Sequence, residues 1–131
     1  QSLKMAGLCS GEPDYVGVQA AACDPVVRAF HHGLEAAATA AEELTLAEGV
    51  RVRTPVHIKA LLAEIPAEKG RFLSITEDEI RRAHAAVCQQ GFYVEPTSAI
   101  VWAAFEHLKA KLTPPIILIL TGNGLKYISQ T

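Results

Sequence analysis

The residues best suited to bind a ligand follow the most apolar segment of the chain. Thr121-Gly122-Asn123-Gly124 comes directly after residues 116–120, five consecutive apolar side chains. In an open α/β sheet, ligands bind beyond the carboxyl ends of the strands. The two glycines allow close backbone approach to a ligand, and the Thr121 hydroxyl can donate or accept a hydrogen bond. The alternative is a plain turn after a strand, with its glycines at positive φ.

A second group of polar residues, Glu95-Pro96-Thr97-Ser98, follows the short apolar segment Phe92-Tyr93-Val94. One interpretation is a helix start, because Thr97 or Ser98 would be a good N-cap. The other places the Glu95 carboxylate and a hydroxyl at the same sheet edge as Thr121. The sequence leaves both interpretations open.

The histidines and cysteines predict neither a metal site nor a catalytic residue. His84 and Cys88 are spaced i, i+4, but two ligands do not complete a tetrahedral site and no Cys-x-x-Cys pair adds to them. Cys23 lies near a helix start, which would lower a thiol pKa, or it is simply buried. The Gly-x-Ser-x-Gly sequence of a nucleophile elbow is missing.

Composition limits the class of protein. The chain has 131 residues, 50% of them hydrophobic, which suits a single domain, or part of one, with its own core over residues 1–131. Twelve basic against 14 acidic residues argue against a nucleic-acid partner. No apolar run approaches the ~20 residues of a membrane span. Three widely spaced cysteines indicate a reducing compartment, so we expect a cytoplasmic protein.

The alternation of strand and helix patterns predicts an α/β fold, a layered αβα arrangement with a mainly parallel sheet. Strands are expected at residues 15–19, 72–75 and 116–120, with the last central and buried because apolar runs typify sheets covered on both faces.

Helices are expected to connect these strands. One begins at Asp24-Pro25 with Asp24 as N-cap, and another covers residues 58–65. The capping box Thr76-Glu77-Asp78-Glu79 opens a third, and the fourth starts near Pro96. The expected buried stripe of the third is Ile80, Ala83 and Val87, and that of the fourth is Val101, Ala104, Phe105, Leu108 and Leu112.

Five segments in order resemble a known family. They are residues 16–25, residues 47–55, residues 76–80, Gly91-Phe92-Tyr93-Val94-Glu95-Pro96-Thr97-Ser98-Ala99 and Thr121-Gly122-Asn123-Gly124-Leu125-Lys126. Together they are similar to the C-terminal part of the threonine synthases. These enzymes belong to the fold-type II group that depends on pyridoxal 5'-phosphate (PLP).

The resemblance implies a fold of two α/β domains with PLP between them, of which this chain is an incomplete part. It also implies that Thr121 hydrogen-bonds the pyridine nitrogen of the cofactor, with Glu95 and Thr97 near the ring. Residues 47–49 would line the site. The intact enzyme would convert O-phospho-L-homoserine and water to L-threonine and phosphate.

The chain also departs from the family. The family's cofactor-bearing lysine lies in a Ser-x-Lys motif far upstream, and none of the six lysines here has that context. The glycine-rich phosphate loop would lie upstream too. We therefore expect a C-terminal fragment that binds no PLP alone, with the remainder of the parent enzyme as its partner and with homo-oligomerisation. The alternative is a stand-alone α/β domain that binds a small ligand, or an interaction module, without catalysis.

Overall fold

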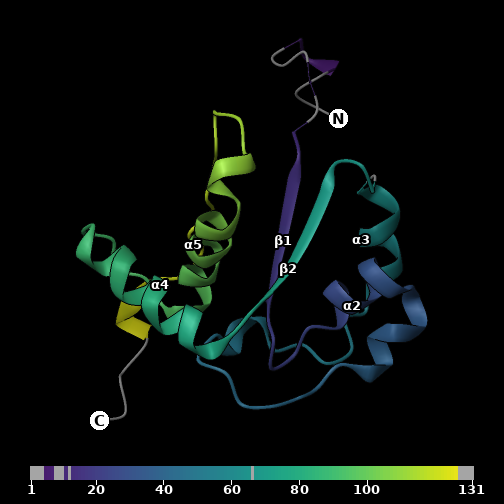
Figure 1. The fold of residues 1–131 in the computed structure, drawn as a ribbon, viewed down its shortest axis with the longest axis horizontal. Coiled ribbons are helices and arrows are strands. Elements are labelled where there is room, and N and C mark those ends of the chain that lie inside the picture. The colour runs from purple at the N-terminus through teal and green to yellow at the C-terminus, as the bar shows by residue number, and fades with distance from the viewer. Residues whose placement is uncertain (1–4, 8–10, 12, 66, 127–131) are drawn as a thin grey trace.

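Two parallel strands lie between two layers of helices (Figure 1). The computed structural model describes residues 5–7, 11, 13–65 and 67–126. The strands are β1 (Tyr15–Ala20) and β2 (Gly70–Ile75). On one side lie α2 (Pro25–His32) and α3 (Ile58–Glu64), and on the other α4 (Glu77–Gln89) and α5 (Pro96–Leu108). The predicted αβα layering and parallel pairing are confirmed.

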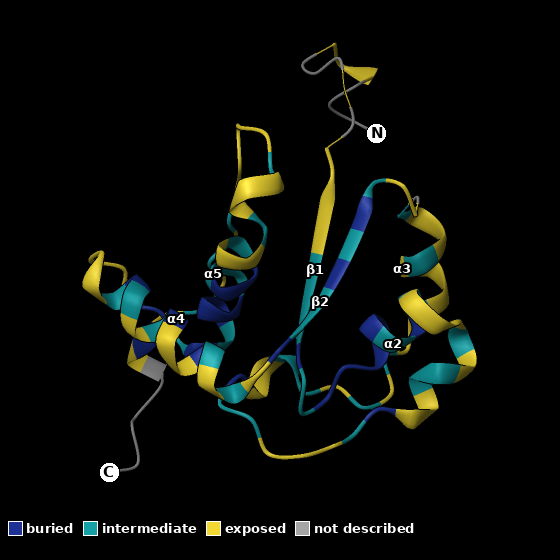
Figure 2. Cartoon of the chain, viewed as in Figure 1, coloured by how far each residue is buried: buried dark blue, intermediate teal, exposed yellow. Residues whose placement is uncertain are grey.

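Alternation along the strands divides the core between these layers. Tyr15 pairs with Gly70 and the register runs to Ala20 opposite Ile75. Ala20 and Ile75 face α5, whereas Phe72 packs with α2 and α3. The upper end of β1 is exposed, as Figure 2 shows. The buried end of β1 is therefore the end that leads into the loop before α2, whereas β2 has buried residues along its whole length.

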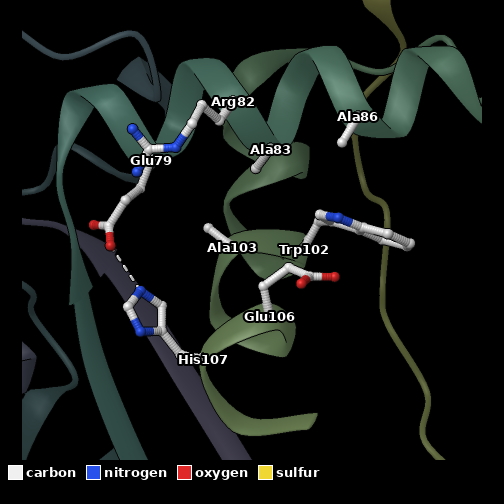
Figure 3. A pocket seen from close by; sticks show the side chains of 8 residues that line it. All are labelled: Glu79, Arg82, Ala83, Ala86, Trp102, Ala103, Glu106 and His107. Carbon is white, nitrogen blue, oxygen red and sulfur yellow. Dashed lines mark hydrogen bonds and ion pairs between the residues drawn. The ribbon is translucent and has the colours of Figure 1, made fainter.

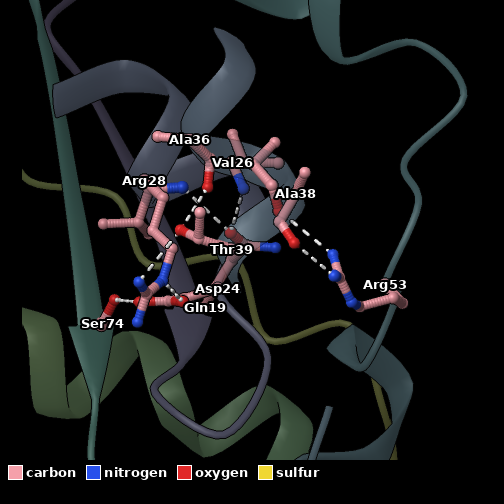
Figure 4. A network of polar contacts seen from close by, with 11 residues as sticks. Gln19, Asp24, Val26, Arg28, Ala36, Ala38, Thr39, Arg53 and Ser74 are labelled. Atoms are coloured by element: carbon pink, nitrogen blue, oxygen red, sulfur yellow. Dashed lines mark hydrogen bonds and ion pairs between the residues drawn. The ribbon is translucent and has the colours of Figure 1, made fainter. Parts of the chain in front are cut away.

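The start of α2 is held by a residue from β1. Asp24 occupies the N-cap position, as predicted, but its side chain makes no capping hydrogen bond. The Gln19 side-chain oxygen instead accepts from the amides of Val26 and Val27, at 2.8 and 3.1 Å. The Asp24 carboxylate binds Arg28 at 2.7 Å and accepts from the Ser74 hydroxyl at 2.6 Å (Figure 4). Asp24 therefore ties α2 to β2.

The start of α4 follows the sequence closely. The Glu79 carboxylate accepts from the Thr76 amide at 2.8 Å, and the Thr76 hydroxyl accepts from the Glu79 amide, which completes the predicted capping box. Ile80, Ala83 and Val87 are the buried residues of this helix, as expected.

The predicted buried face of α5 is largely wrong. The helix begins at Pro96, but Glu95 is the N-cap residue, and neither Thr97 nor Ser98 occupies that position. The buried residues are Pro96, Ser98, Ala99, Ile100, Ala103 and Ala104. Of these residues, only Ala104 belongs to the expected stripe, whose other members have larger side chains. Because α5 packs against both the sheet and α4, its small residues are buried where the backbones approach closely.

The predicted central strand at residues 116–120 is also wrong. No strand is assigned to this segment, and Ile117 and Ile119 are 83% and 70% exposed. Within the described residues β1 and β2 pair only with each other, so no neighbouring strand is present to cover this segment. Leu120 alone packs against a buried cluster, formed by Val87, Val94 and Ala99.

Candidate functional site

Three segments that are distant in the sequence meet here: the N-terminus of α5, the turn at residues 121–124, and the 3₁₀ helix Glu48–Val50. Ser98 joins the first two. Ser98 is 1% exposed. Its hydroxyl oxygen accepts the Gly122 amide hydrogen at 2.6 Å and lies 3.4 Å from the Thr121 hydroxyl oxygen. The Gly122 carbonyl oxygen is 3.3 Å away. Ser98 therefore fixes the turn that presents Thr121, whose side chain stands at the surface.

Glu95 holds the same turn from the other side. Its amide donates to the Gly122 carbonyl at 3.3 Å. Its carboxylate lies against the Gly122 backbone, because a Cβ at position 122 would come within 1.8 Å of a Glu95 carboxylate oxygen. An antiparallel bridge between Val94 and Asn123 continues the contact. Gly122 is required here for close approach rather than for a special φ angle.

Thr97 connects the third segment, the short 3₁₀ helix Glu48–Val50. Its hydroxyl oxygen accepts the Gly49 amide hydrogen at 3.1 Å. A Cβ at Gly49 would lie 3.0 Å from the Thr97 methyl group, so this approach is close as well. Ala47, the residue before this helix, is fully buried in the main core cluster, which anchors the loop to the sheet.

The structure thus brings together the three residues expected at one site. Glu95 lies against the turn at Gly122, which carries Thr121, and Thr97 extends the site toward Gly49. Thr121 does not follow a strand, contrary to the prediction, because residues 116–120 form none. Sequence reasoning missed the role of Ser98, which was considered only as a helix cap. No residue pattern marks a buried serine that accepts from a turn 24 residues away.

The polar groups at this site fit one end of PLP only. A hydroxyl such as that of Thr121 suits a ring nitrogen, whereas the cofactor phosphate needs amide donors or cations. The start of α5 is poorly suited to a phosphate, since Glu95 is acidic, Pro96 has no N–H group, and the amides of Ser98 and Ala99 are bound to the Glu95 carbonyl. A phosphate anchor would have to come from outside this turn.

The other long helices in the described part of the chain also lack a free N-terminus. The first amides of α2 are bound by the Gln19 side chain. The start of α4 is closed by its capping box and carries three acidic residues in its first turn, Glu77, Asp78 and Glu79. These helix starts are therefore unsuited to a phosphate.

A separate groove of about 560 Å³ runs between α4 and α5 (Figure 3). Ala83, Ala86 and Ala103 are among its lining residues, and Trp102 stands beside them. At one end His107 lies 2.7 Å from the Glu79 carboxylate. None of the three predicted site residues lines this groove.

The thiol of Cys23 is not activated. Cys23 is fully buried, and this burial, followed by the nearby charge of Glu42, raises the pKa of its thiol. Burial without a role, one of the two interpretations of this residue, therefore describes it better. His84 and Cys88 do touch, with 3.8 Å between a ring nitrogen and the sulfur.

Two other kinds of feature are missing from the described ranges. No three His, Cys, Asp or Glu side chains gather there as metal ligands would. The helices in the same ranges are all too short or too polar to cross a membrane.

The chain is similar to several threonine synthases and to one solved deaminase. It is 28% identical to threonine synthase of Methanocaldococcus jannaschii over 96% of its length, and 31% identical to that of Mycobacterium leprae over 92%. It spans 32% of each of these relatives. The crystal structure of a threonine deaminase from the organism abbreviated T.th. superimposes with a TM-score of 0.63 at 26% identity, covering 82% of this chain and 39% of that one.

The family-level comparison agrees with the fold and with these relatives. Residues 3–122 match the family described as "Pyridoxal-phosphate dependent enzyme". This match covers most of the chain and includes Glu95, Thr97, Ser98 and Thr121. The chain belongs to the pyridoxal-phosphate dependent enzyme family.

Proposed function

We propose that this chain forms the C-terminal third of a threonine-synthase-like enzyme. The intact protein would convert O-phospho-L-homoserine and water to L-threonine and phosphate. The observation that carries the proposal is the similarity to threonine synthases along almost the whole chain, combined with a span of 32% of their length. PLP, when bound, supplies the electron sink for the carbanion chemistry that such a replacement requires.

In this proposal the chain supplies one wall of the cofactor site. Thr121 presents its hydroxyl to the ring nitrogen from a turn that Ser98 and Glu95 hold in place. Glu95 and Thr97 border the ring, and the 3₁₀ segment Glu48–Val50 lines the site next to Thr97. No lysine or phosphate-binding residue is assigned to this part of the protein.

The proposed partner of this chain is the remainder of the enzyme. Residues 116–120 support this idea, since their exposed side chains Ile117 and Ile119 suit a strand that lacks neighbours. The same surface makes the isolated chain prone to self-association, so we also propose homo-oligomerisation. The free thiols of Cys23 and Cys88 are the basis for proposing a cytoplasmic location.

A threonine-deaminase-like activity is the second candidate. It is favoured by the TM-score of 0.63 to the deaminase at 26% identity. The identity to the threonine synthases is similar in size and extends over more of the chain, which favours the first candidate.

The experiment is to express the full-length protein that contains this chain and to assay both reactions. With O-phospho-L-homoserine we expect phosphate and threonine in equal amounts, and with threonine we expect no ammonia. Ammonia released from threonine without phosphate release from O-phospho-L-homoserine would favour the deaminase-like candidate. A protein that turns over neither substrate and takes up no PLP would contradict both candidates.

A further inference from the structure

Two polar side chains lie on the face of α4 that packs into the core. Glu77 and His84 are separated by about two helical turns, so they project from the same side of the helix. The buried residues Ile80, Ala83 and Val87 belong to this side as well. Polar groups on a buried face need hydrogen-bond partners. Glu77 and His84 each bind the backbone of a different segment that leads into the candidate site.

His84 holds the segment that carries Glu95. The His84 Nε2 atom lies 2.8 Å from the Val94 carbonyl oxygen. Because a carbonyl oxygen only accepts, Nε2 carries a hydrogen and donates it. The bridge to residues 122–124 uses the other edge of this segment, through the Glu95 amide and the Tyr93 carbonyl. The segment is therefore held on both edges, by α4 on one and by the turn on the other.

Glu77 holds the loop that leads into the 3₁₀ helix Glu48–Val50. One oxygen of its carboxylate accepts the Leu46 amide hydrogen at 2.9 Å. The other oxygen is buried and has no hydrogen-bond partner among the described residues. A buried carboxylate oxygen without a donor lowers stability. The contact with Leu46 is thus retained although it does not maximise stability, as is typical of residues that serve a functional site.

We propose that Glu77 and His84 are positioning residues through which α4 holds both segments against the start of α5. The loop held by Glu77 reaches α5 where the Gly49 amide donates to the Thr97 hydroxyl at 3.1 Å. The segment held by His84 runs directly into α5 at Glu95. This inference rests on the proposed function, in which both segments border the cofactor. The family resemblance gives neither Glu77 nor His84 a role.

The first test needs no cofactor. In the full-length protein that contains this chain, hydrogen exchange read by mass spectrometry at single residues reports on the amides of Gly49 and Gly124, which bind Thr97 and the Tyr93 carbonyl. We expect His84→Ala to speed exchange at Gly124 by about two- to tenfold and to leave Gly49 unchanged, since one hydrogen bond is lost on one side only. Glu77→Ala should do the reverse. Faster exchange at both amides alike, or at neither, would overturn the inference.

Further variants separate positioning from a general loss of stability. Glu77→Gln keeps an acceptor and His84→Gln keeps a donor, so both should restore slow exchange. His31→Ala is the matched control, because it removes a histidine contact to another main-chain carbonyl, that of Phe72 at 3.0 Å, outside the site. It should leave the Gly49 and Gly124 amides unchanged. If it speeds their exchange as the other alanine variants do, these amides report only overall stability and the inference fails.

The second test asks whether the two contacts matter to the reaction. With the substrate that the full-length protein turns over, we expect kcat/KM to fall in Glu77→Ala and His84→Ala, to recover in the two glutamine variants, and to keep its wild-type value in His31→Ala. Wild-type kcat/KM in both Glu77→Ala and His84→Ala would show that the contacts are structural only and would overturn the inference. If the wild type takes up no PLP and turns over neither substrate, the proposed function fails, and hydrogen exchange alone decides whether α4 holds the two segments.

Discussion

The carboxylate of Glu95 occupies the space that a side chain at position 122 would need. A Cβ on Gly122 would lie 1.8 Å from the Glu95 carboxylate oxygen and 2.6 Å from its Cγ, so rotating only the end of the side chain would not relieve the overlap. The same glycine donates its amide hydrogen to Ser98. Position 122 therefore couples the two contacts that present Thr121.

The first prediction concerns this overlap. Gly122→Ala should lower the free energy of unfolding by about 1–3 kcal/mol, the usual cost of overpacking. In Glu95→Ala the space is vacated, so adding Gly122→Ala to that variant should cost much less. Chemical denaturation of the two single variants and the double variant measures this coupling. Additive effects of the two changes would contradict the packing described here.

Residue types and glycine spacing in the sequence marked Glu95, Thr97 and Thr121, and the structure brings these residues close together. Their role toward a cofactor stays a prediction. The contact between Ser98 and Gly122 was not visible, since it joins residues 24 apart in the sequence through the tertiary fold. Local patterns carry no signal for such a pairing.

The fold shows the same division between local and non-local information. The α4 capping box and its stripe of Ile80, Ala83 and Val87 were predicted correctly because both are set within one helix. Residues 116–120 were predicted to be a central strand, but a strand also needs partners, and hydrophobicity alone does not supply them. In α5 the large side chains suggested the wrong face, because close packing between helix backbones selects small residues.

The second prediction is a pH dependence centred on Glu79. Hydrogen bonds from the Thr76 side chain and amide, with a further contribution from His107, hold the pKa of the Glu79 carboxyl below its usual value. A lowered folded-state pKa stabilises the protein above the unfolded-state pKa, and this contribution is lost as the pH falls through the folded-state pKa. Glu79→Gln preserves a capping-box residue type and removes the charge. Its unfolding free energy should therefore fall less steeply with acid than that of the wild type, as measured by urea titrations between neutral pH and about pH 3.

A third prediction separates the cap from the charge. Thr76→Ala should destabilise the protein by about 1 kcal/mol, because the Glu79 amide loses its hydroxyl acceptor at the start of α4. The loss should persist at neutral pH, where Glu79 stays ionised. Thermal unfolding at neutral pH checks it, with Thr39→Ala as a comparison at an exposed threonine that caps no α-helix. Equal effects of the two substitutions would argue against a specific capping role.

The fourth prediction tests the role of Thr121 in the full-length protein. Thr121→Val preserves the side-chain shape and removes the hydroxyl, so the fold should remain intact while PLP binds about two- to tenfold more weakly or turnover changes. That range corresponds to one hydrogen bond of about 0.5–1.5 kcal/mol. Fluorescence titration with PLP measures the affinity, and Thr39→Val, at an exposed threonine outside the site, is the control. Wild-type affinity and kinetics in Thr121→Val would show that the role carried over from the family is wrong.

The last prediction is that the 131-residue chain alone does not attach PLP covalently and does not make threonine. Attachment needs a lysine held against the cofactor aldehyde with a lowered pKa, and burial is the usual means of lowering it. Among lysines whose side chains the structure describes, Lys59, Lys109 and Lys111 are exposed and Lys69 is only half-buried. The helix starts of α2, α4 and α5 are unsuited to hold the phosphate, as their Gln19 contact, capping box and Glu95-Pro96 sequence show.

The measurement is to mix the purified chain with PLP, reduce the mixture with borohydride, and map modified lysines by mass spectrometry. We expect only scattered, substoichiometric labelling of exposed lysines, because the hydrogen bond from Thr121 contributes too little alone to hold the cofactor. An unrelated protein with a similar number of exposed lysines gives the background. Stoichiometric labelling of one lysine, Lys126 above all because it belongs to the segment that carries Thr121, would show that this chain contains a complete cofactor site and would overturn its assignment as one part of a larger enzyme.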